Sequence, residues 1–315
     1  MGNSKRMITT FDELMKHAAA MPEKRVAVVN PKNEETFSAI ADALQILKAR
    51  FILVGTKDAI CQAIKTYEIP AQSVEVVDAA DLDSATRSAI SLAREGRADI
   101  LMKGSVDTST MMKAVLKDES GLRLGRLLSD IFILEYPQRE DNKFVMITDG
   151  GMTLAPDLRN KVELIKNAVD VAHALGNQNP KVAVLSATEF VVHNLPSTLD
   201  AAALSKMNER GQIKGCIVDG PLALDNALSP EAAAEKGIKS PVAGHAEILV
   251  AANIESANSL AKSTTYFANL PLAHVIVGGK VPVLIPSRAD KREAKLYSIA
   301  LGMIMSEFSR SQDGD

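Results

Sequence analysis

Short, almost continuously apolar runs alternate along this chain with longer segments in which apolar residues recur every three or four positions. Continuous apolar runs are typical of strands in a parallel sheet that helices cover on both faces. The runs predict strands at residues 25–30, 51–55, 74–78, 99–104, 131–136, 144–149, 181–186, 215–219, 247–252 and 274–278.

The intervening segments have the 3.6-residue period of amphipathic helices. Residues 34–50 place Phe37, Ile40 and Leu44 on one face, and residues 158–175 and 196–210 have the same pattern. Residues 290–307 begin with charged side chains and become apolar, which predicts a helix with a buried second half. Strand and helix alternation predicts an α/β fold with a largely parallel sheet.

The length of 315 residues favours two domains. A charged, proline-containing stretch at residues 136–143 is the expected boundary, and the chain is expected to cross back near residues 282–288. We therefore predict a first domain from residues 1–140 plus 287–315 and a second from residues 141–286.

Composition excludes several classes of protein. A net charge of −3 and the absence of basic runs argue against a nucleic-acid-binding protein. The longest apolar runs are too short to span a bilayer. Cys61 and Cys216 lack metal or redox spacing, and the first residues lack the apolar core of a secretory signal. We expect reduced thiols and a cytoplasmic protein.

Ligands of parallel α/β sheets bind beyond the carboxyl ends of the strands, so polar residues there are the candidates for chemistry. In residues 102–113, a predicted strand end is followed by Gly104, small hydroxyl residues and a helix expected to begin near Thr110. A helix N-terminus with free N–H groups suits an anion such as phosphate. The alternative is a capped helix without a ligand. The candidates are Lys103, Ser105, Thr108, Ser109 and Lys113.

Three further strand exits carry polar residues. Ser287 and Arg288 follow one exit, and an arginine can bind phosphate with two parallel hydrogen bonds. Asp219 ends another predicted strand, while Asn253, Glu255 and Asn258 follow a third. The alternative for each is ordinary helix capping. No HExxH, GxSxG, GxGxxG or P-loop pattern is present, which argues against those enzyme classes.

Together these segments resemble the phosphate acetyltransferase/phosphate butyryltransferase family. The resemblance rests on KGSVDTSTMMKAVL, DGPLALDNALSPEAAAEKGIKSPVAGHAEILV, ANIESAN and PVLIPSRAD, in this order and spacing. Chain length and the PSRAD variant are closer to the butyryl branch. The family implies a two-domain, three-layer αβα fold of the isocitrate/isopropylmalate dehydrogenase type, an interdomain active site and a homodimer or higher homo-oligomer.

The resemblance also implies reversible acyl transfer between coenzyme A and inorganic phosphate by direct attack in a ternary complex. It implies no metal and no permanently bound cofactor, because coenzyme A is a substrate. Arg288 corresponds to a phosphate-binding residue and Ser287 to a group that contacts the carbonyl or thiol. Ala294 stands where acetyl-branch enzymes have a thiol-proton acceptor, which leaves Asp290 and Glu293 as substitutes. The other candidates correspond to residues lining the site.

Two alternatives remain open at the level of sequence. An NAD-dependent decarboxylating dehydrogenase of the same architecture would need metal-binding aspartates with a spacing that this chain lacks. An acyl-CoA sensor or inactive relative would bind coenzyme A without turnover, although this chain keeps Ser287 and Arg288.

Overall fold

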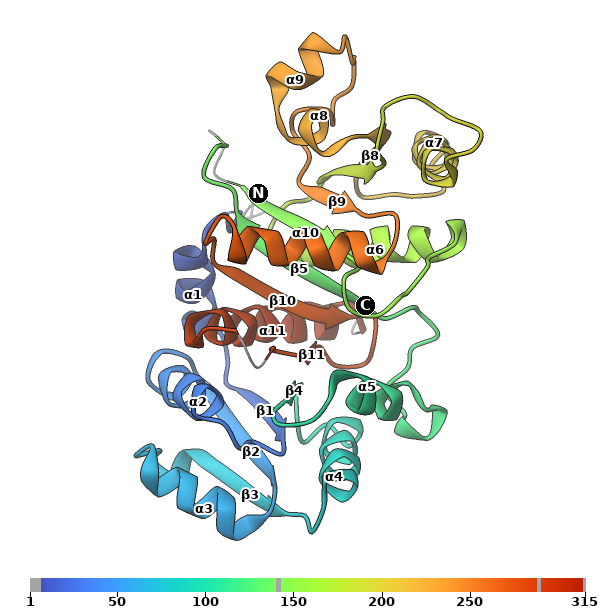
Figure 1. Cartoon of the computed structure of the whole chain (residues 1–315). Coiled ribbons are helices and arrows are strands. Elements are labelled where there is room, and N and C mark those ends of the chain that lie inside the picture. The colour runs from blue at the N-terminus through green and yellow to red at the C-terminus, as the bar shows by residue number, and fades with distance from the viewer. Residues whose placement is uncertain (1–6, 140–142, 288–289, 314–315) are drawn as a thin grey trace. The chain divides into compact units, whose positions relative to one another are not determined.

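A computed structural model describes residues 7–139, 143–287 and 290–313. The chain divides into two compact units. One, which we call the split unit, comprises Phe11–Arg126 and Ala273–Asp315. The other, the middle unit, comprises Leu127–Leu272 and the residues up to Thr10. Both are α/β units, as the alternating sequence pattern predicts (Figure 1).

The split unit contains a sheet in the strand order β3-β2-β1-β4-β11-β10. Neighbouring strands from β3 to β11 are parallel, while β10 and β11 are antiparallel. Parallel neighbours leave the sheet at the same edge, which collects the segments that follow them. The strands are β1 (Lys24–Val29), β2 (Ala49–Gly55), β3 (Val74–Asp78), β4 (Ile100–Lys103), β10 (Leu272–Val277) and β11 (Val283–Leu284).

The helices of the split unit are α1 (Phe11–Ala20), α2 (Glu34–Ile46), α3 (Lys57–Thr66), α4 (Leu82–Arg94), α5 (Thr108–Leu116) and α11 (Arg292–Asp313), with short 3₁₀ turns η1 (Ala71–Ser73) and η2 (Asp118–Ser120). Helix α1 precedes the first strand of the split unit, and the other helices of the unit follow its strands in the chain. Helix α11 packs against α1 and α2, and Tyr297 stacks on Phe11 with ring centroids 4.3 Å apart. Ile299, Leu301 and Met303 are fully buried, so the apolar half of α11 is part of the core.

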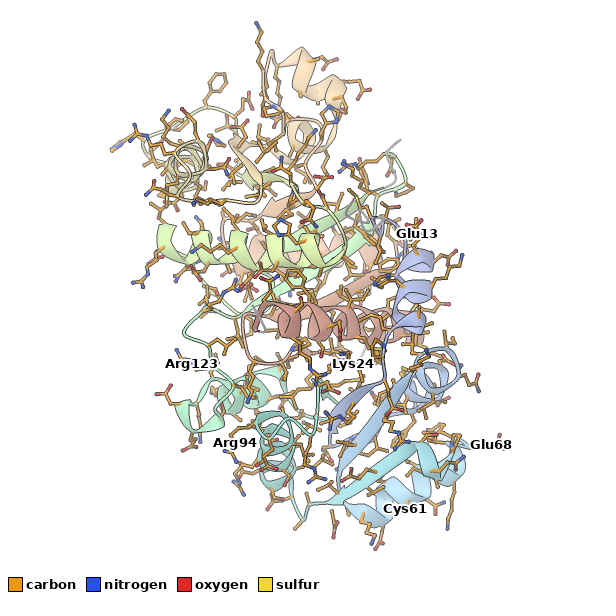
Figure 2. All side chains as sticks on the ribbon, turned by 180° about the vertical axis from the view of Figure 1, so that it is seen from behind. Glu13, Lys24, Cys61, Glu68, Arg94 and Arg123 are labelled. Atoms are coloured by element: carbon orange, nitrogen blue, oxygen red, sulfur yellow. The ribbon has the colours of Figure 1, made fainter. Side chains whose placement is uncertain are left out.

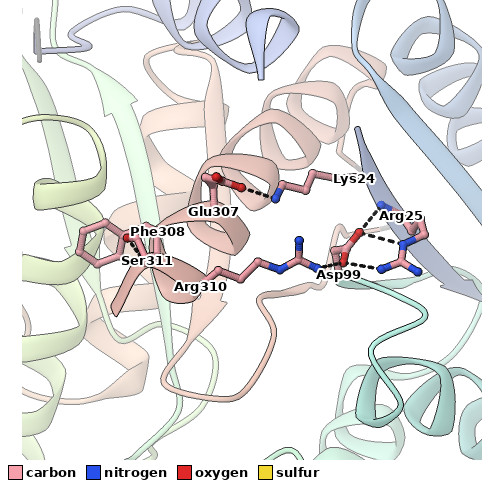
Figure 3. A network of polar contacts seen from close by, with 7 residues as sticks. All are labelled: Lys24, Arg25, Asp99, Glu307, Phe308, Arg310 and Ser311. Carbon is pink, nitrogen blue, oxygen red and sulfur yellow. Dashed lines mark hydrogen bonds and ion pairs between the residues drawn. The ribbon is translucent and has the colours of Figure 1, made fainter. Parts of the chain in front are cut away.

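An ion cluster joins the C-terminal half of α11 to the beginnings of β1 and β4 (Figure 3). Asp99, whose side chain is 2% exposed, accepts hydrogen bonds from the Arg25 backbone N–H at 2.7 Å and from the Arg25 guanidinium at 3.0 Å, and it also pairs with Arg310. Lys24 pairs with Glu307. These contacts lie at the amino ends of the strands, away from the edge where polar loops leave the sheet.

The middle unit has a sheet in the order β5-β6-β9-β7-β8. Strands β5 and β6 are antiparallel and the remaining neighbours are parallel. The strands are β5 (Ser129–Glu135), β6 (Phe144–Thr148), β7 (Lys181–Leu185), β8 (Ile217–Leu222) and β9 (Ile248–Val250). The helices are α6 (Leu158–Ala174), α7 (Pro196–Glu209), α8 (Leu224–Leu228), α9 (Pro230–Glu235) and α10 (Ile254–Tyr266).

The structure differs from the sequence prediction at two places that matter for the fold. The predicted helix at residues 34–50 ends at Ile46, because Ala49 and Arg50 already pair with Lys24 and Arg25 of β1. The two-residue strand β11 was not predicted as an element, although residue 284 was read as a strand exit. Strand β11 lies between β4 and β10 in the sheet, and its two residues are enough to pair with both neighbours.

The compact units also divide the chain at positions other than the predicted boundaries. Residues 136–143 connect the antiparallel strands β5 and β6, so this charged stretch joins two strands of the middle unit. Residues 273–286 carry β11, which pairs with β4, so they belong to the split unit.

Both cysteines are free thiols. Cys61 lies on α3 (Figure 2), and burial raises the pKa of the Cys216 thiol to about 11. Across the described part of the chain, every helix is too short or too polar to cross a membrane.

Candidate active site

The exit of β4 is held close to the exit of β1. Lys103, the last residue of β4, is 5% exposed. The Gly104 N–H donates to the Val29 carbonyl at 2.9 Å and the Ser105 N–H donates to the Asn30 carbonyl at 2.8 Å. A Cβ atom on Gly104 would lie 2.5 Å from the Val29 oxygen. Only glycine fits this close approach, which fixes where the hydroxyl-rich loop leaves the sheet.

Helix α5 begins at Thr108, two residues before the predicted start near Thr110. Asp107 occupies the N-cap position but makes no side-chain capping bond. Thr108 is half-buried, while Ser109 and Lys113 are exposed on the helix. The hydroxyl groups are therefore in the first turn of α5, where free backbone N–H groups favour an anion.

Beyond β11, two hydrogen bonds join Ser287 and Asp290. The Asp290 N–H donates to the Ser287 carbonyl at 3.2 Å, and the Ser287 N–H donates to Asp290 Oδ2 at 2.6 Å. Glu293 is exposed in the first turn of α11. Arg288 lies outside the described residues.

The two segments leave the sheet at the same edge. Strands β4 and β11 are parallel neighbours, with Leu284 opposite Met102 and Val283 opposite Leu101. Lys103–Ser109 and Ser287 thus follow adjacent strands in the same direction. The split unit therefore brings to one edge two of the segments that the sequence analysis selected separately, those at the ends of β4 and β11.

The middle unit positions the remaining candidates. Asp219 lies inside β8, which continues to Leu222, instead of ending the strand as predicted, and its Oδ1 accepts the Gly220 N–H at 2.8 Å. Asn253 is the N-cap of α10 and accepts the Ser256 N–H at 2.9 Å. Glu255 is exposed in the first turn. Asn258 donates from its amide to the Gly150 carbonyl at 2.9 Å, so it holds the loop after β6.

Sequence reasoning missed two residues that shape these edges. Asn30 follows β1 in a left-handed conformation, with φ of 53°, and its amide donates to the Ser105 carbonyl at 2.9 Å. An asparagine directly after a strand was the available signal, because asparagine tolerates this conformation better than most residues. Asn30 therefore supports the loop that carries the predicted phosphate contacts.

The second is Asp149, which follows β6. Its carboxylate accepts the backbone N–H groups of Asp130, Gly151 and Met152 at 3.0, 3.0 and 3.1 Å, and that of Thr153 at 2.8 Å. Burial raises the pKa of Asp149 to about 6, against the lowering effect of these donors. Gly150 and Gly151 follow Asp149 directly in the chain, and the Gly151 N–H is one of these four donors.

Within the described ranges, the His, Cys, Asp and Glu side chains form no group of three or more that could hold a metal ion.

Solved structures define the class of the fold. A branched-chain phosphotransacylase from Enterococcus faecalis matches with a TM-score of 0.79 and 32% identity, covering 90% of this chain and 99% of that one. A phosphotransacetylase from Streptococcus pyogenes, at 18% identity, has the same fold with a TM-score of 0.77, covering 94% and 98% of the two chains. This is the α/β fold shared by phosphotransacylases and isocitrate/isopropylmalate dehydrogenase-like enzymes.

Sequence comparison is more specific. The family described as "Phosphate acetyl/butaryl transferase" matches residues 79–303, and this chain belongs to it. A phosphate butyryltransferase from Clostridium beijerinckii is 42% identical over 300 residues, which cover 95% of this chain and 99% of the relative. A phosphate acetyltransferase from Thermotoga maritima is 40% identical over 296 residues, covering 94% and 100%. The resemblance stated from the motifs is confirmed.

Proposed function

We propose that this chain catalyses the reversible transfer of a short acyl group, butyryl or acetyl, between coenzyme A and inorganic phosphate. The observation that carries this proposal is its likeness, over nearly the whole of both chains, to relatives named phosphate butyryltransferase and phosphate acetyltransferase. The protein is thus an acyltransferase, and the products are acyl phosphate and free coenzyme A.

The phosphate is assigned to the edge of the split unit where β4 and β11 end. Arg288 would grip two phosphate oxygens, and the first turn of α5 would supply hydroxyl and N–H donors from Thr108 and Ser109. Lys103 and Ser105 precede that helix. The parallel pairing of β4 with β11 supports this assignment, because it brings both segments to one edge.

The acyl transfer needs no unusual nucleophile, because phosphate itself attacks the acyl group. A phosphate oxygen attacks the thioester carbonyl, the new carbon–oxygen bond forms, and the carbon–sulfur bond breaks as the thiolate leaves. Ser287 would donate to the oxyanion that develops on the carbonyl. In reverse the thiol must lose its proton, for which Glu293 and Asp290 are the sequence candidates. Holding both substrates together supplies a large part of the rate enhancement, about 7–11 kcal/mol in well-oriented cases.

Several finer parts of the proposal come from the family resemblance. Asp219, Asn253, Glu255, Asn258 and Lys113 are assigned to substrate contact. Coenzyme A is a substrate, and we expect no permanently bound cofactor or metal. The free thiols of Cys61 and Cys216 are compatible with a cytoplasmic protein, and a homodimer or higher homo-oligomer is expected.

A direct assay tests the function. Purified protein is mixed with butyryl-CoA or acetyl-CoA, phosphate is added, and free thiol is followed with a thiol-reactive dye. We expect phosphate-dependent thiol release with both substrates, and the ratio of their kcat/KM values defines the preferred acyl group. A folded protein that binds coenzyme A but releases no thiol with either substrate would contradict the proposal and favour an acyl-CoA sensor.

A further inference from the structure

The carboxylate of Asp290 is already engaged with the backbone of Ser287. Its Oδ2 accepts the Ser287 N–H at 2.6 Å, while the Asp290 N–H returns a bond to the Ser287 carbonyl at 3.2 Å. The two bonds hold Asp290 against Ser287, three positions earlier in the chain. A carboxylate that holds its neighbour's N–H fixes the direction in which the Ser287 side chain leaves the backbone.

Two buried side chains hold Asp290 from other elements. His274 of β10 has a side chain 10% exposed, and its Nε2 lies 3.9 Å from Asp290 Oδ2. Lys295 of α11 has 1% of its surface exposed, and its ammonium donates to the Asp290 carbonyl. Burial lowers the pKa of Lys295, while Asp290 and Glu35 of α2 act in the opposite direction.

His274 is itself fixed by α11. Its backbone N–H donates to Ser298 Oγ at 3.1 Å, and Ser298 is 2% exposed. Strands β10 and β11 pair antiparallel, so His274 near the start of β10 lies beside the exit of β11. Ser287 and His274 of β10 therefore approach the carboxylate of Asp290, while Lys295 of α11 binds its backbone carbonyl.

We propose that Asp290 is a positioning residue, which with His274 and Lys295 sets the Ser287 backbone for catalysis, and that it is not the acceptor of the thiol proton. This inference rests on the proposed function. Oδ2 of Asp290 accepts the Ser287 N–H and lies beside His274. Taking up a proton would remove the negative charge of this carboxylate and weaken the bond that holds Ser287, which disfavours Asp290 as the proton acceptor. The inference leaves Glu293, exposed in the first turn of α11, as the carboxylate for the proton.

Replacement by asparagine separates the two roles. Asp290→Asn keeps an amide oxygen that can accept the Ser287 N–H but cannot take up a proton at neutral pH. Asp290→Ala removes both abilities. We expect Asp290→Asn to keep kcat within about tenfold of the wild type and Asp290→Ala to lose about a hundredfold or more. His274→Gln, which keeps a polar group, should retain more activity than His274→Ala.

The measurement is kcat and KM for butyryl-CoA and phosphate in the thiol-release assay, with the exposed Asp12→Asn of α1 as the matched control. Equal loss of kcat in Asp290→Asn and Asp290→Ala, at unchanged KM, would overturn the positioning role, and so would full activity of Asp290→Ala. If Asp290→Ala does not fold, the Asp290→Asn value alone decides. A wild type without phosphate-dependent thiol release would overturn the proposed function as well. An active wild type with an inactive Asp290→Asn variant is a different pattern, which would overturn the positioning role alone.

Discussion

At the scale of single residues, several predicted site side chains also hold the backbone in place. Asn253 caps α10 through its bond from the Ser256 N–H, and Asn258 ties the same helix to the Gly150 carbonyl. Asn30 does the same for Ser105 at the β4 exit. Amide side chains near strand exits therefore build the loop geometry, whatever contact they make with substrate.

Arg288 offers the most direct test of the phosphate assignment. Arg288→Ala should lower kcat/KM for phosphate by about a hundredfold or more, equivalent to about 3 kcal/mol, because the proposed bidentate contact with phosphate would be lost. The urea midpoint should change little. Steady-state kinetics with varied phosphate provides the measurement.

Arg292→Ala is the matched control for that variant. Arg292 is an exposed residue of α11 that pairs with Asp42 of α2, and exposed pairs contribute only about 0–1 kcal/mol. It should keep nearly full activity. Near wild-type turnover by Arg288→Ala would remove the phosphate role from Arg288.

Asp149 predicts a pH dependence of stability. Its pKa is raised by burial from 3.8 to about 6, so the folded state binds the proton more tightly than the unfolded state. Its contribution is therefore complete below about pH 3.8 and is lost as the pH rises through about 6. The shift of about two units corresponds to about 3 kcal/mol.

Urea unfolding of the wild type and Asp149→Asn between pH 4 and pH 7 measures this effect. We expect the free energy of unfolding of the wild type to fall, relative to Asp149→Asn, by about 2–2.5 kcal/mol over this range, which covers most of the full effect. The exposed Asp12→Asn should follow the wild type. Parallel curves for the wild type and Asp149→Asn would show that Asp149 does not titrate in this range.

At the scale of elements, sequence patterning predicted most of the strands and the long helices. Continuous apolar runs such as residues 144–149 match β6 (Phe144–Thr148), in which every residue is buried, because burial on both faces leaves a clear signal. Strand β11 has two residues and produces no pattern of its own. The end of α2 was misplaced because Leu47 continues the helical stripe although β2 begins at Ala49.

The sequence predicted the candidate site as a set of residues at strand exits. It did not predict that β4 pairs with β11. Ser287 and Asp290 are joined by a side-chain bond, and Asp290 also lies beside His274 of β10, which is distant in sequence. Neither has a local sequence signature. The sequence therefore predicts the types of residue in the site and the strand ends that carry them. The contacts that orient these side chains depend on tertiary packing.

The exit of β4 gives a test at this scale. Gly104→Ala should destabilise the fold by about 1–3 kcal/mol and lower kcat/KM for phosphate, because the new Cβ would overlap the Val29 and Asn30 carbonyl oxygens at 2.5 and 2.8 Å. Gly55→Ala, at the β2 exit, is the control, since its nearest neighbour lies at an ordinary 3.4 Å. Equal stability and activity in the two variants would contradict a tight β4 exit.

At the scale of the whole molecule, one unit is assembled from two distant stretches of chain. Phe11–Arg126 supplies β1 to β4, and Ala273–Asp315 supplies β11 and α11. The ion cluster around Asp99 is one of the contacts that join the two stretches.

Removing Asp99 should weaken that junction. Asp99→Ala is expected to cost about 3 kcal/mol, because it removes a buried carboxylate that bonds the Arg25 backbone and two guanidinium groups. Arg310→Ala should cost about 0–1 kcal/mol, since the Arg310 side chain is 55% exposed. Urea unfolding curves measure both. A smaller loss in Asp99→Ala than in Arg310→Ala would show that the cluster does not join the stretches.

The split composition of this unit has a consequence for synthesis on the ribosome. The ion pair between Lys24 and Glu307, which are 283 positions apart, cannot form until the last stretch of the chain has been synthesised. Strand β4 likewise has no parallel partner on its β11 side until that stretch emerges. The middle unit can fold during that interval, whereas the N-terminal strands stay incomplete with an open edge. Nascent chains stalled before residue 273 should therefore depend on chaperones more than the finished protein does.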